Sequence, residues 1–253
     1  MRSTAWVAPD GTPVTVAPIA TVDLRLVSGS WTEDAALKAR VAAHWAAEVA
    51  RNPSLWNGSV LATRAPGRAG GLVLEAGVLR ADAITMEFAG FVAWRDWGFP
   101  DLGFRNLFGS AVIQSSDGAL FYGRMADWTA NAGKVYPPGG SLEPRDLRAD
   151  GTIDVIGSIE TEMAEETGLA AAQAVVAGTY AVFDGPRVSV ARHYRFRQTA
   201  DELLAGIRAE IAGQRRSELS DMVVIRDAAA LDPETVPGYA LAIAETVLGP
   251  AQD

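Results

Sequence analysis

The chain has 253 residues, 49% of them hydrophobic and 21% charged, which is the composition of an ordinary soluble globular protein. Its net charge of −9 argues against a general nucleic-acid binder, and the absence of cysteine excludes disulfides, thiolate nucleophiles and zinc–thiolate sites. No apolar run approaches the ~18–20 residues of a membrane span and the N-terminus lacks a signal peptide, so we expect a cytoplasmic protein without a membrane partner.

The first part of the chain, residues 1–105, combines short strands with one long helix. Residues 1–18 predict a loosely ordered arm or a short hairpin around PDGTP, and residues 21–28 alternate as a strand does. Thr32 is the expected N-cap of a helix that runs to about Arg51. The apolar residues of this helix recur every four positions and predict one buried stripe: Leu37, Val41, Trp45 and Val49. Strands, or a strand leading into a short helix, are predicted at residues 59–66, 71–80 and 83–91.

From residue 106 the predicted order is β-β-loop-α-β-β-α-β-α. Residues 106–125 read as a hairpin about an Asp-Gly turn, and residues 136–144 (YPPGGSLEP) as a loop before an acidic helix. The later strands and helices are expected at residues 171–183, 187–197, 200–213, 221–227 and 238–249. This order predicts a mixed α/β domain over residues 106–253, with residues 1–105 as an α+β extension packed on it.

The acidic helix contains IETEMAEETGLA, with four glutamates in seven positions and no cation among them. At 100° per residue, Glu162, Glu165 and Glu166 share an arc of about 100°, whereas Glu160 points away. Three converging carboxylates form a hard oxygen site that suits Mg²⁺ or Mn²⁺, and magnesium held in this way normally also binds phosphate. The alternative is a solvated acidic helix face.

Two glycines precede this helix. Gly139 and Gly140 allow the backbone to approach a ligand closely, and the prolines before them stiffen the loop. Together, GGSLEPRD…IETEMAEETGL resembles the Nudix box, G-x5-E-x7-R-E-U-x-E-E-x-G-U, where U is a bulky apolar residue. The residues in register are Glu162, Met163, Glu165, Glu166, Gly168 and Leu169.

The resemblance implies a Nudix-type α/β/α sandwich with a mixed β-sheet. It also implies Mg²⁺-dependent hydrolysis of the diphosphate linkage of a nucleoside diphosphate joined to another moiety. The box departs from the family in three ways: Asp146 stands where the family has Glu, seven extra residues lie inside it, and Thr161 replaces the arginine. That arginine helps orient the glutamates in the family, so its absence implies either another arginine in this role or a slower enzyme.

The lengthened box and the NPSLWNG segment of the extension are similar to a divergent Nudix branch that includes UDP-sugar hydrolases. A UDP-sugar or related nucleotide sugar is therefore the expected substrate. Many Nudix proteins are dimers, so the resemblance also admits a homodimer.

The resemblance assigns roles to individual residues. Glu162 and Glu166 become the main metal ligands, Glu165 the third ligand or the catalytic base, and a carbonyl near Gly139 or Gly140 commonly completes such a site. Glu218, in the RRSELSD loop, is a second candidate base; the alternative is an exposed loop residue.

Other candidates come from strands and aromatic segments. Arg124 and Arg192 are expected to bind phosphate, although either could face solvent. The histidines at positions 44 and 193 are expected to be structural. Three tryptophans could stack on a base or sugar or fill the core: Trp94, Trp97 and Trp128.

Two other functions remain open. One is a non-catalytic Nudix-fold module that binds a nucleotide as a sensor, which the replaced arginine and altered spacing allow. The other is an acidic interaction domain without a metal. The three glutamates of the box favour the hydrolase.

Overall fold

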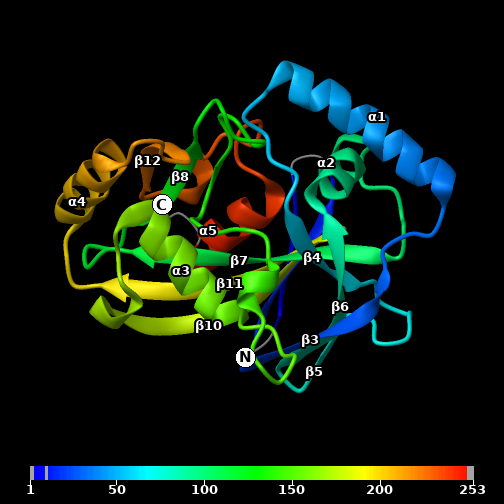
Figure 1. Ribbon diagram of the computed structural model, residues 1–253. Coiled ribbons are helices and arrows are strands. Elements are labelled where there is room, and N and C mark those ends of the chain that lie inside the picture. The colour runs from blue at the N-terminus through cyan, green and yellow to red at the C-terminus, as the bar shows by residue number, and fades with distance from the viewer. Residues whose placement is uncertain (1–2, 9–10, 250–253) are drawn as a thin grey trace.

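A computed structural model describes residues 3–8 and 11–249, and Figure 1 shows its strands and helices. The described strands are β1 Thr4–Val7, β2 Pro13–Pro18, β3 Thr21–Ser30, β4 Ser59–Arg64, β5 Val73–Glu75, β6 Val78–Glu87, β7 Phe104–Gln114, β8 Leu120–Met125, β9 Val135–Tyr136, β10 Ala174–Asp184, β11 Arg187–Phe196 and β12 Leu219–Ile225. The described α-helices are α1 Ala35–Arg51, α2 Phe88–Asp96, α3 Val155–Thr167, α4 Ala200–Gly213 and α5 Gly238–Leu248.

One mixed sheet joins the twelve described strands, with the main order β1-β2-β10-β11-β7-β4-β6-β3. The β7–β11 and β3–β6 pairs are parallel, and the other pairs are antiparallel. The expected hairpin of residues 106–125 is present, but β8 pairs with β7 only at Ile113 and Gln114. Strand β8 pairs with β12 along its whole length but leaves β7 after Phe121, and the glycine loop then bonds to β7, with the Ala111 N–H donating to Pro138 and the Gly109 N–H to Gly140.

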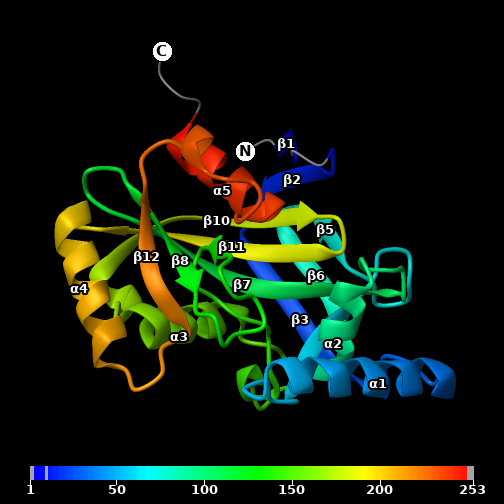
Figure 2. The ribbon, with the colours of Figure 1, turned by 90° about the horizontal axis from the view of Figure 1, so that it is seen from above.

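The helices cover both faces of this sheet, as Figure 2 shows for α5 on one side and α3 on the other. On the α3 side, Ile159 and Met163 are fully buried against the sheet. The helix comes so close to β7 that a Cβ atom at Gly109 would lie 2.4 Å from the Ile159 side chain. On the opposite face, α5 packs on β2, β10 and β8 through its own apolar cluster. The predicted α/β/α sandwich with a mixed sheet is confirmed.

The N-terminal 105 residues add to the same sheet. The arm forms the predicted hairpin, β1–β2, and β2 continues the sheet by pairing with β10 at Val16↔Val182. Pro9 and Asp10 of PDGTP lie outside the described residues. Strand β4 pairs with the start of β7, and β6 leads directly into α2, which confirms a strand followed by a short helix. The boundary between residues 105 and 106 stays a prediction.

Helix α1 differs from the expectation at its start and on its buried face. Its N-cap is Asp34, whose carboxylate accepts the backbone N–H groups of Ala36 and Leu37, so the predicted Thr32 cap is wrong. Within the expected stripe only Val41 is buried. The reason is that α1 lies over α2 at the margin of the molecule, so most of the stripe stays half-buried (Figure 1). Over residues 3–8 and 11–249, no helix combines the length and apolarity that crossing a membrane requires.

Candidate active site

The acidic helix α3 presents its glutamates to two different sides, as its periodicity predicts. Asp154 caps the N-terminus by accepting the Gly157 N–H, and Gly168 ends the helix in the left-handed conformation, as expected. Glu160 faces away from the other glutamates and accepts a hydrogen bond from the Tyr194 hydroxyl at 3.1 Å.

The glycine loop lies directly against two of these carboxylates. The Gly139 N–H donates to Oε2 of the buried Glu166 at 2.9 Å. Gly139 has φ +153°, and a Cβ atom there would lie 2.2 Å from the Gly109 carbonyl oxygen, so only glycine fits. A Cβ atom at Gly140 would lie 3.0 Å from the Glu162 carboxyl carbon. The loop and the acidic helix therefore form one unit.

Only one of the two glycine carbonyls is open to a ligand. Gly140 accepts a hydrogen bond from the Gly109 N–H at 3.2 Å, which fixes the loop to β7. Within the described part of the chain, no hydrogen bond is made to the Gly139 carbonyl oxygen. Of the two carbonyls expected to complete a metal site, that of Gly139 is therefore the available one.

Burial and mutual repulsion disfavour the charged forms of the helix carboxyl groups. Burial raises the pKa of Glu162 to about 7; Arg145 opposes this rise, while Glu165 and Glu218 add to it. Burial also raises the pKa of Glu166 well above its ordinary value, and the nearby Glu162 raises it further. A divalent cation would stabilise both carboxylates in the charged form.

An arginine that the sequence does not single out lies beside the acidic face of α3. The Arg145 guanidinium is 2.5 Å from Glu162 Oε1, 3.5 Å from Glu165 and 3.4 Å from Glu143. Arg145 directly precedes Asp146, before the seven extra residues, and it pairs with Glu162 and Glu165, whereas Thr161 stands in the place of the expected arginine. Arg148, which follows Asp146 in the lengthened stretch, pairs with Asp154 at 2.7 Å instead.

The turn that precedes the extra residues is held against α3 by Asp146. Its Oδ2 accepts hydrogen bonds from the Glu143 N–H at 2.8 Å and the Ser158 hydroxyl at 3.1 Å. Asp146 thus anchors the turn that carries Arg145, while Glu143, three residues after Gly140, faces the cleft.

The glutamates open onto a cleft of about 460 Å³. One side of this cleft is lined by four glutamates and one arginine: Glu143, Glu162, Glu165, Glu218 and Arg145. The N-terminal extension contributes Trp56 and Phe88 to its wall. Trp128 and both glycines of the loop also line it. Glu218 keeps an exposed surface, yet partial desolvation and then the neighbouring carboxylates Glu165 and Glu143 raise its pKa. This cleft therefore brings together three of the glutamates proposed from the sequence, Glu162, Glu165 and Glu218. Glu166 lies behind them.

A second compartment of about 320 Å³ adjoins the first through Gly139 and Gly140. Its wall is aromatic and basic: Phe91, Phe99, Tyr136, Tyr239, Arg95, Lys134 and Arg187. The Arg187 guanidinium lies 5.7 Å from the centroids of both the Phe99 and Tyr239 rings and pairs with Asp184. Sequence reasoning missed these residues because they come from separate elements with no shared motif.

Neither arginine predicted to bind phosphate lines these compartments. Arg124 is exposed on β8 opposite Asp221 of β12. Arg192 lines a separate cavity of about 230 Å³ and donates to the Thr179 hydroxyl at 3.4 Å. Their role in binding stays a prediction.

The remaining aromatic and histidine candidates divide between core and cleft. Trp94 is buried in an aromatic cluster, and Trp97 stacks under the Arg40 guanidinium, so of the three predicted tryptophans only Trp128 lines the cleft. His193 is buried and shares a 2.9 Å hydrogen bond with Gln114, which fits the structural role expected of it.

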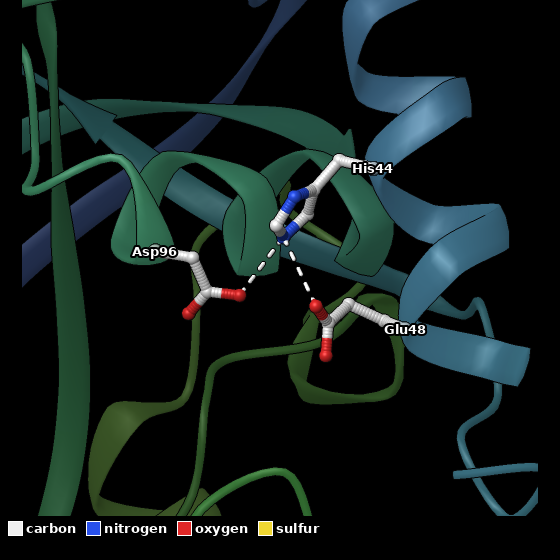
Figure 3. A group of neighbouring side chains, drawn as sticks. All are labelled: His44, Glu48 and Asp96. Atoms are coloured by element: carbon white, nitrogen blue, oxygen red, sulfur yellow. Dashed lines mark hydrogen bonds and ion pairs between the residues drawn. The ribbon is translucent and has the colours of Figure 1, made fainter. Parts of the chain in front are cut away.

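His44 belongs to a separate group with metal-ligand spacing, which Figure 3 shows between α1 and α2. Its Nε2 is 2.9 Å from Asp96 and 3.6 Å from Glu48, and the three ligand atoms lie within 4.8 Å of one another. Both carboxylates are already paired, Glu48 with Arg51 and Asp96 with Arg95. The group is therefore a charge-balanced link between two helices. Among the described residues, no three glutamates of α3 reach this spacing; Arg145 pairs with two of them instead.

Comparisons with known proteins give structural likeness only: no family model and no curated protein matches the chain. A MutT protein from Methanosarcina mazei is 18% identical over 56% of this chain and 92% of its own, with a TM-score of 0.39. The Nudix hydrolase RenU from M. smegmatis is 14% identical over 59% and 89%, with a TM-score of 0.35. The Nudix domain of NrtR from Shewanella oneidensis, complexed with ADP-ribose, is 14% identical over 48% and 72%, with a TM-score of 0.31. Scores this low do not define a fold by themselves. The structure itself shows the expected layered mixed sheet, with the glycine loop against the acidic helix α3.

Proposed function

We propose that the chain belongs to the Nudix superfamily and hydrolyses the diphosphate linkage of a nucleoside diphosphate joined to another moiety, with a divalent cation. The observation that carries this proposal is the glycine loop seated against Glu162 and Glu166. Both carboxyl groups have raised pKa values; Glu162 lines a cleft large enough for a small molecule, and Glu166 is buried against Gly139 of its wall. The substrate is a small nucleotide, and the cleft's acidic side disfavours nucleic acid unless a cation intervenes.

The donor groups present fit Mg²⁺ or Mn²⁺. Such a cation would be held by the oxygen atoms of Glu162, Glu166 and the Gly139 carbonyl, and Glu165 can supply a further carboxylate. A cation held there would neutralise charge on the diphosphate and lower the pKa of a bound water. The absence of sulfur ligands from the chain also favours a hard cation.

Side chains of the protein would accept the proton of the attacking water and orient the carboxylates around it. Water adds to one phosphorus, the bond from that phosphorus to the bridging oxygen breaks, and the other phosphate leaves with the bridging oxygen. Glu218 or Glu165 accepts the proton of the water, and a raised pKa brings the Glu218 carboxylate closer to the range of an effective base at neutral pH. Arg145 orients Glu162 and Glu165 in place of the box arginine.

A nucleotide sugar, in particular a UDP-sugar, is the substrate we propose at finer scale. The support is the resemblance of the lengthened box and of NPSLWNG to that branch. Two adjoining compartments also provide separate room for the two halves of such a molecule. A cytoplasmic location and a homodimer are part of the same proposal.

One observation favours a different function, a nucleotide-binding module without catalysis. Arg145 pairs with both Glu162 and Glu165, and its single positive charge offsets part of the negative charge that would otherwise attract a cation. A protein that kept this pairing in solution would bind a nucleotide without cleaving it.

A substrate screen separates these functions. UDP-glucose, ADP-ribose, dinucleotides and triphosphates are incubated with Mg²⁺, and phosphate is measured after a phosphatase is added. We expect release with wild type, little with Glu166→Gln, and near-normal release with the matched Glu160→Gln, whose side chain lies on the other face of α3. Inactivity on every compound, combined with thermal stabilisation by a nucleotide, would favour the module. UDP-glucose turning over no faster than ADP-ribose would remove the case for a UDP-sugar.

A further inference from the structure

One aromatic side chain at the cleft is uncovered. Trp56 is 76% exposed, and among the described residues it is the only aromatic side chain in the set of strongly exposed large hydrophobics. Burying an indole removes a large apolar area from water, so a tryptophan left open at a cleft normally marks a contact surface.

The loop that carries Trp56 is firmly held. On one side, the Asn52 amide donates to the Trp128 carbonyl at 2.8 Å and accepts the Ser54 N–H at 3.1 Å. On the other side, Asn57 accepts the Ala89 N–H at 2.8 Å. The polar residues of NPSLWNG thus fix the loop to α2 and to the segment before β9, and Trp56 projects from a rigid support.

Gly58 allows the indole to lie against its own loop. A Cβ atom at this position would sit 2.2 Å from Cζ3 of Trp56, although the backbone of Gly58 does not itself require glycine by a positive φ. The missing side chain of Gly58 therefore leaves room for the indole of Trp56. One part of the indole rests on the backbone, and most of its surface faces solvent at the cleft.

The ring and the indole N–H of the neighbouring Trp128 already have partners within the protein. The Arg216 guanidinium lies 4.0 Å from the centroid of the Trp128 ring, and the Trp128 indole N–H donates to the Ser217 carbonyl at 3.1 Å. Of the two tryptophans in the cleft wall, only Trp56 has an aromatic surface free to receive a planar group.

We propose that Trp56 is a stacking surface for the heterocyclic base of the nucleotide whose diphosphate reaches Glu162 and Glu166. The inference rests on the proposed function and adds a binding residue supplied by the N-terminal extension. Stacking on an aromatic ring depends on the π-face that every base has, so Trp56 selects nucleotides over base-free diphosphates rather than one base over another.

The test combines binding and turnover. Intrinsic tryptophan fluorescence is titrated with ADP-ribose, UDP-glucose and base-free inorganic pyrophosphate in the presence of Mg²⁺, and KM and kcat are measured for the two nucleotides. We expect Trp56→Ala to weaken both nucleotides about tenfold through KM, with kcat changed much less and pyrophosphate binding unchanged. Trp56→Phe should restore part of the affinity, and Gly58→Ala should weaken nucleotides because it displaces the indole. Val176→Ala, an exposed site on β10, is the matched control.

The outcomes separate this inference from the proposed function. Normal hydrolysis with unchanged nucleotide affinity in Trp56→Ala would overturn the inference and leave the function standing. Nucleotide binding that is lost in Trp56→Ala, in a protein that hydrolyses nothing, would support the inference and contradict the hydrolase. If Trp56→Ala instead separates a dimer into monomers without changing nucleotide affinity, Trp56 is an interface residue and the inference fails. Wild type that binds neither nucleotide contradicts both.

Discussion

Arg145 is the single residue that most affects the charge on the acidic face of α3, because it pairs with Glu162 and Glu165. The helix itself has Thr161 where an arginine is expected. The positive charge of Arg145 holds down part of the rise in the Glu162 pKa, which burial places at about 7. In Arg145→Ala, that pKa should rise further, so fewer Glu162 carboxylates are charged at neutral pH. Hydrolysis should fall about tenfold or more near pH 7 and recover partly at higher pH.

The rate–pH profile of Arg145→Ala checks this prediction. Arg145→Lys should restore part of the rate through its charge, without the guanidinium fork. Arg148→Ala is the control, since Arg148 lies three residues after Arg145 but pairs with Asp154. Faster hydrolysis and tighter Mg²⁺ binding in Arg145→Ala would show instead that this arginine blocks the cation.

Glu218 is the second residue with a testable role, that of catalytic base. Its raised pKa means that the carboxylate forms only as the pH rises above the ordinary range of glutamate, so the rate should increase with pH in the same interval. Glu218→Gln should lower kcat by about 10² or more, leave KM nearly unchanged, and remove that pH dependence. If Glu165→Gln has these effects and Glu218→Gln does not, the base is Glu165.

The glycine loop and α3 act together at the scale of elements. A Cβ atom at position 139 would collide with the Gly109 backbone at 2.2 Å, and φ +153° is a conformation that other residues rarely adopt. Gly139→Ala should therefore displace the loop, break the hydrogen bond to Glu166, and reduce the free energy of unfolding by about 1–3 kcal/mol. The hydrolysis rate of Gly139→Ala should fall by more than the decrease in the fraction of folded protein accounts for.

Urea unfolding and steady-state kinetics measure the two effects of Gly139→Ala. Gly206→Ala in α4 is a suitable control, since no atom lies within 4 Å of its added Cβ. That substitution should raise stability by about 0.5–1 kcal/mol through helix propensity and leave activity unchanged. Wild-type kinetics in Gly139→Ala would refute a role for the loop in the site.

The buried pair of His193 and Gln114 joins β11 to β7 at the centre of the sheet, and its effect extends to the whole molecule. Burial, followed by repulsion from Arg195, lowers the His193 pKa from 6.5 to about 4. The folded protein therefore favours neutral histidine, and this contribution to stability is fully present above about pH 6.5. It is lost as the pH falls towards 4, by about 3 kcal/mol.

Urea unfolding at a series of pH values tests this contribution. The decline in the free energy of unfolding between pH 6.5 and 4 should be smaller in His193→Gln, which keeps a hydrogen-bonding side chain without a titrating ring. Parallel declines for the two proteins would show that other groups govern acid stability.

Across the whole molecule, the sequence predicts what depends on local spacing. The arc of glutamates on α3, the Gly168 cap and the layered α/β order all follow from periodicity and turn residues. The sequence places the N-cap of α1 two residues too early because Thr32 and Asp34 are both good N-cap residues. Its stripe is only partly buried because α1 lies over another helix at the margin.

The rest of the candidate site depends on contacts between distant segments. Nothing local distinguishes Arg145 from Arg148, and only the packing of the turn around Asp146 against α3 brings Arg145 to Glu162. Trp56 reaches the cleft because two asparagines fix its loop to other elements. Arg192 has the alternation of a strand residue, but its strand turns it towards a different cavity.

The central claim is that the acidic face of α3 binds a divalent cation, and Mn²⁺ binding followed by electron paramagnetic resonance tests it most directly. The wild-type protein should take up Mn²⁺, Glu162→Gln and Glu166→Gln should bind it at least about tenfold more weakly, and Mg²⁺ should displace it. Glu160→Gln, on the opposite face, should bind Mn²⁺ as wild type does. No Mn²⁺ uptake by wild type, or equal uptake by Glu166→Gln, would contradict the account.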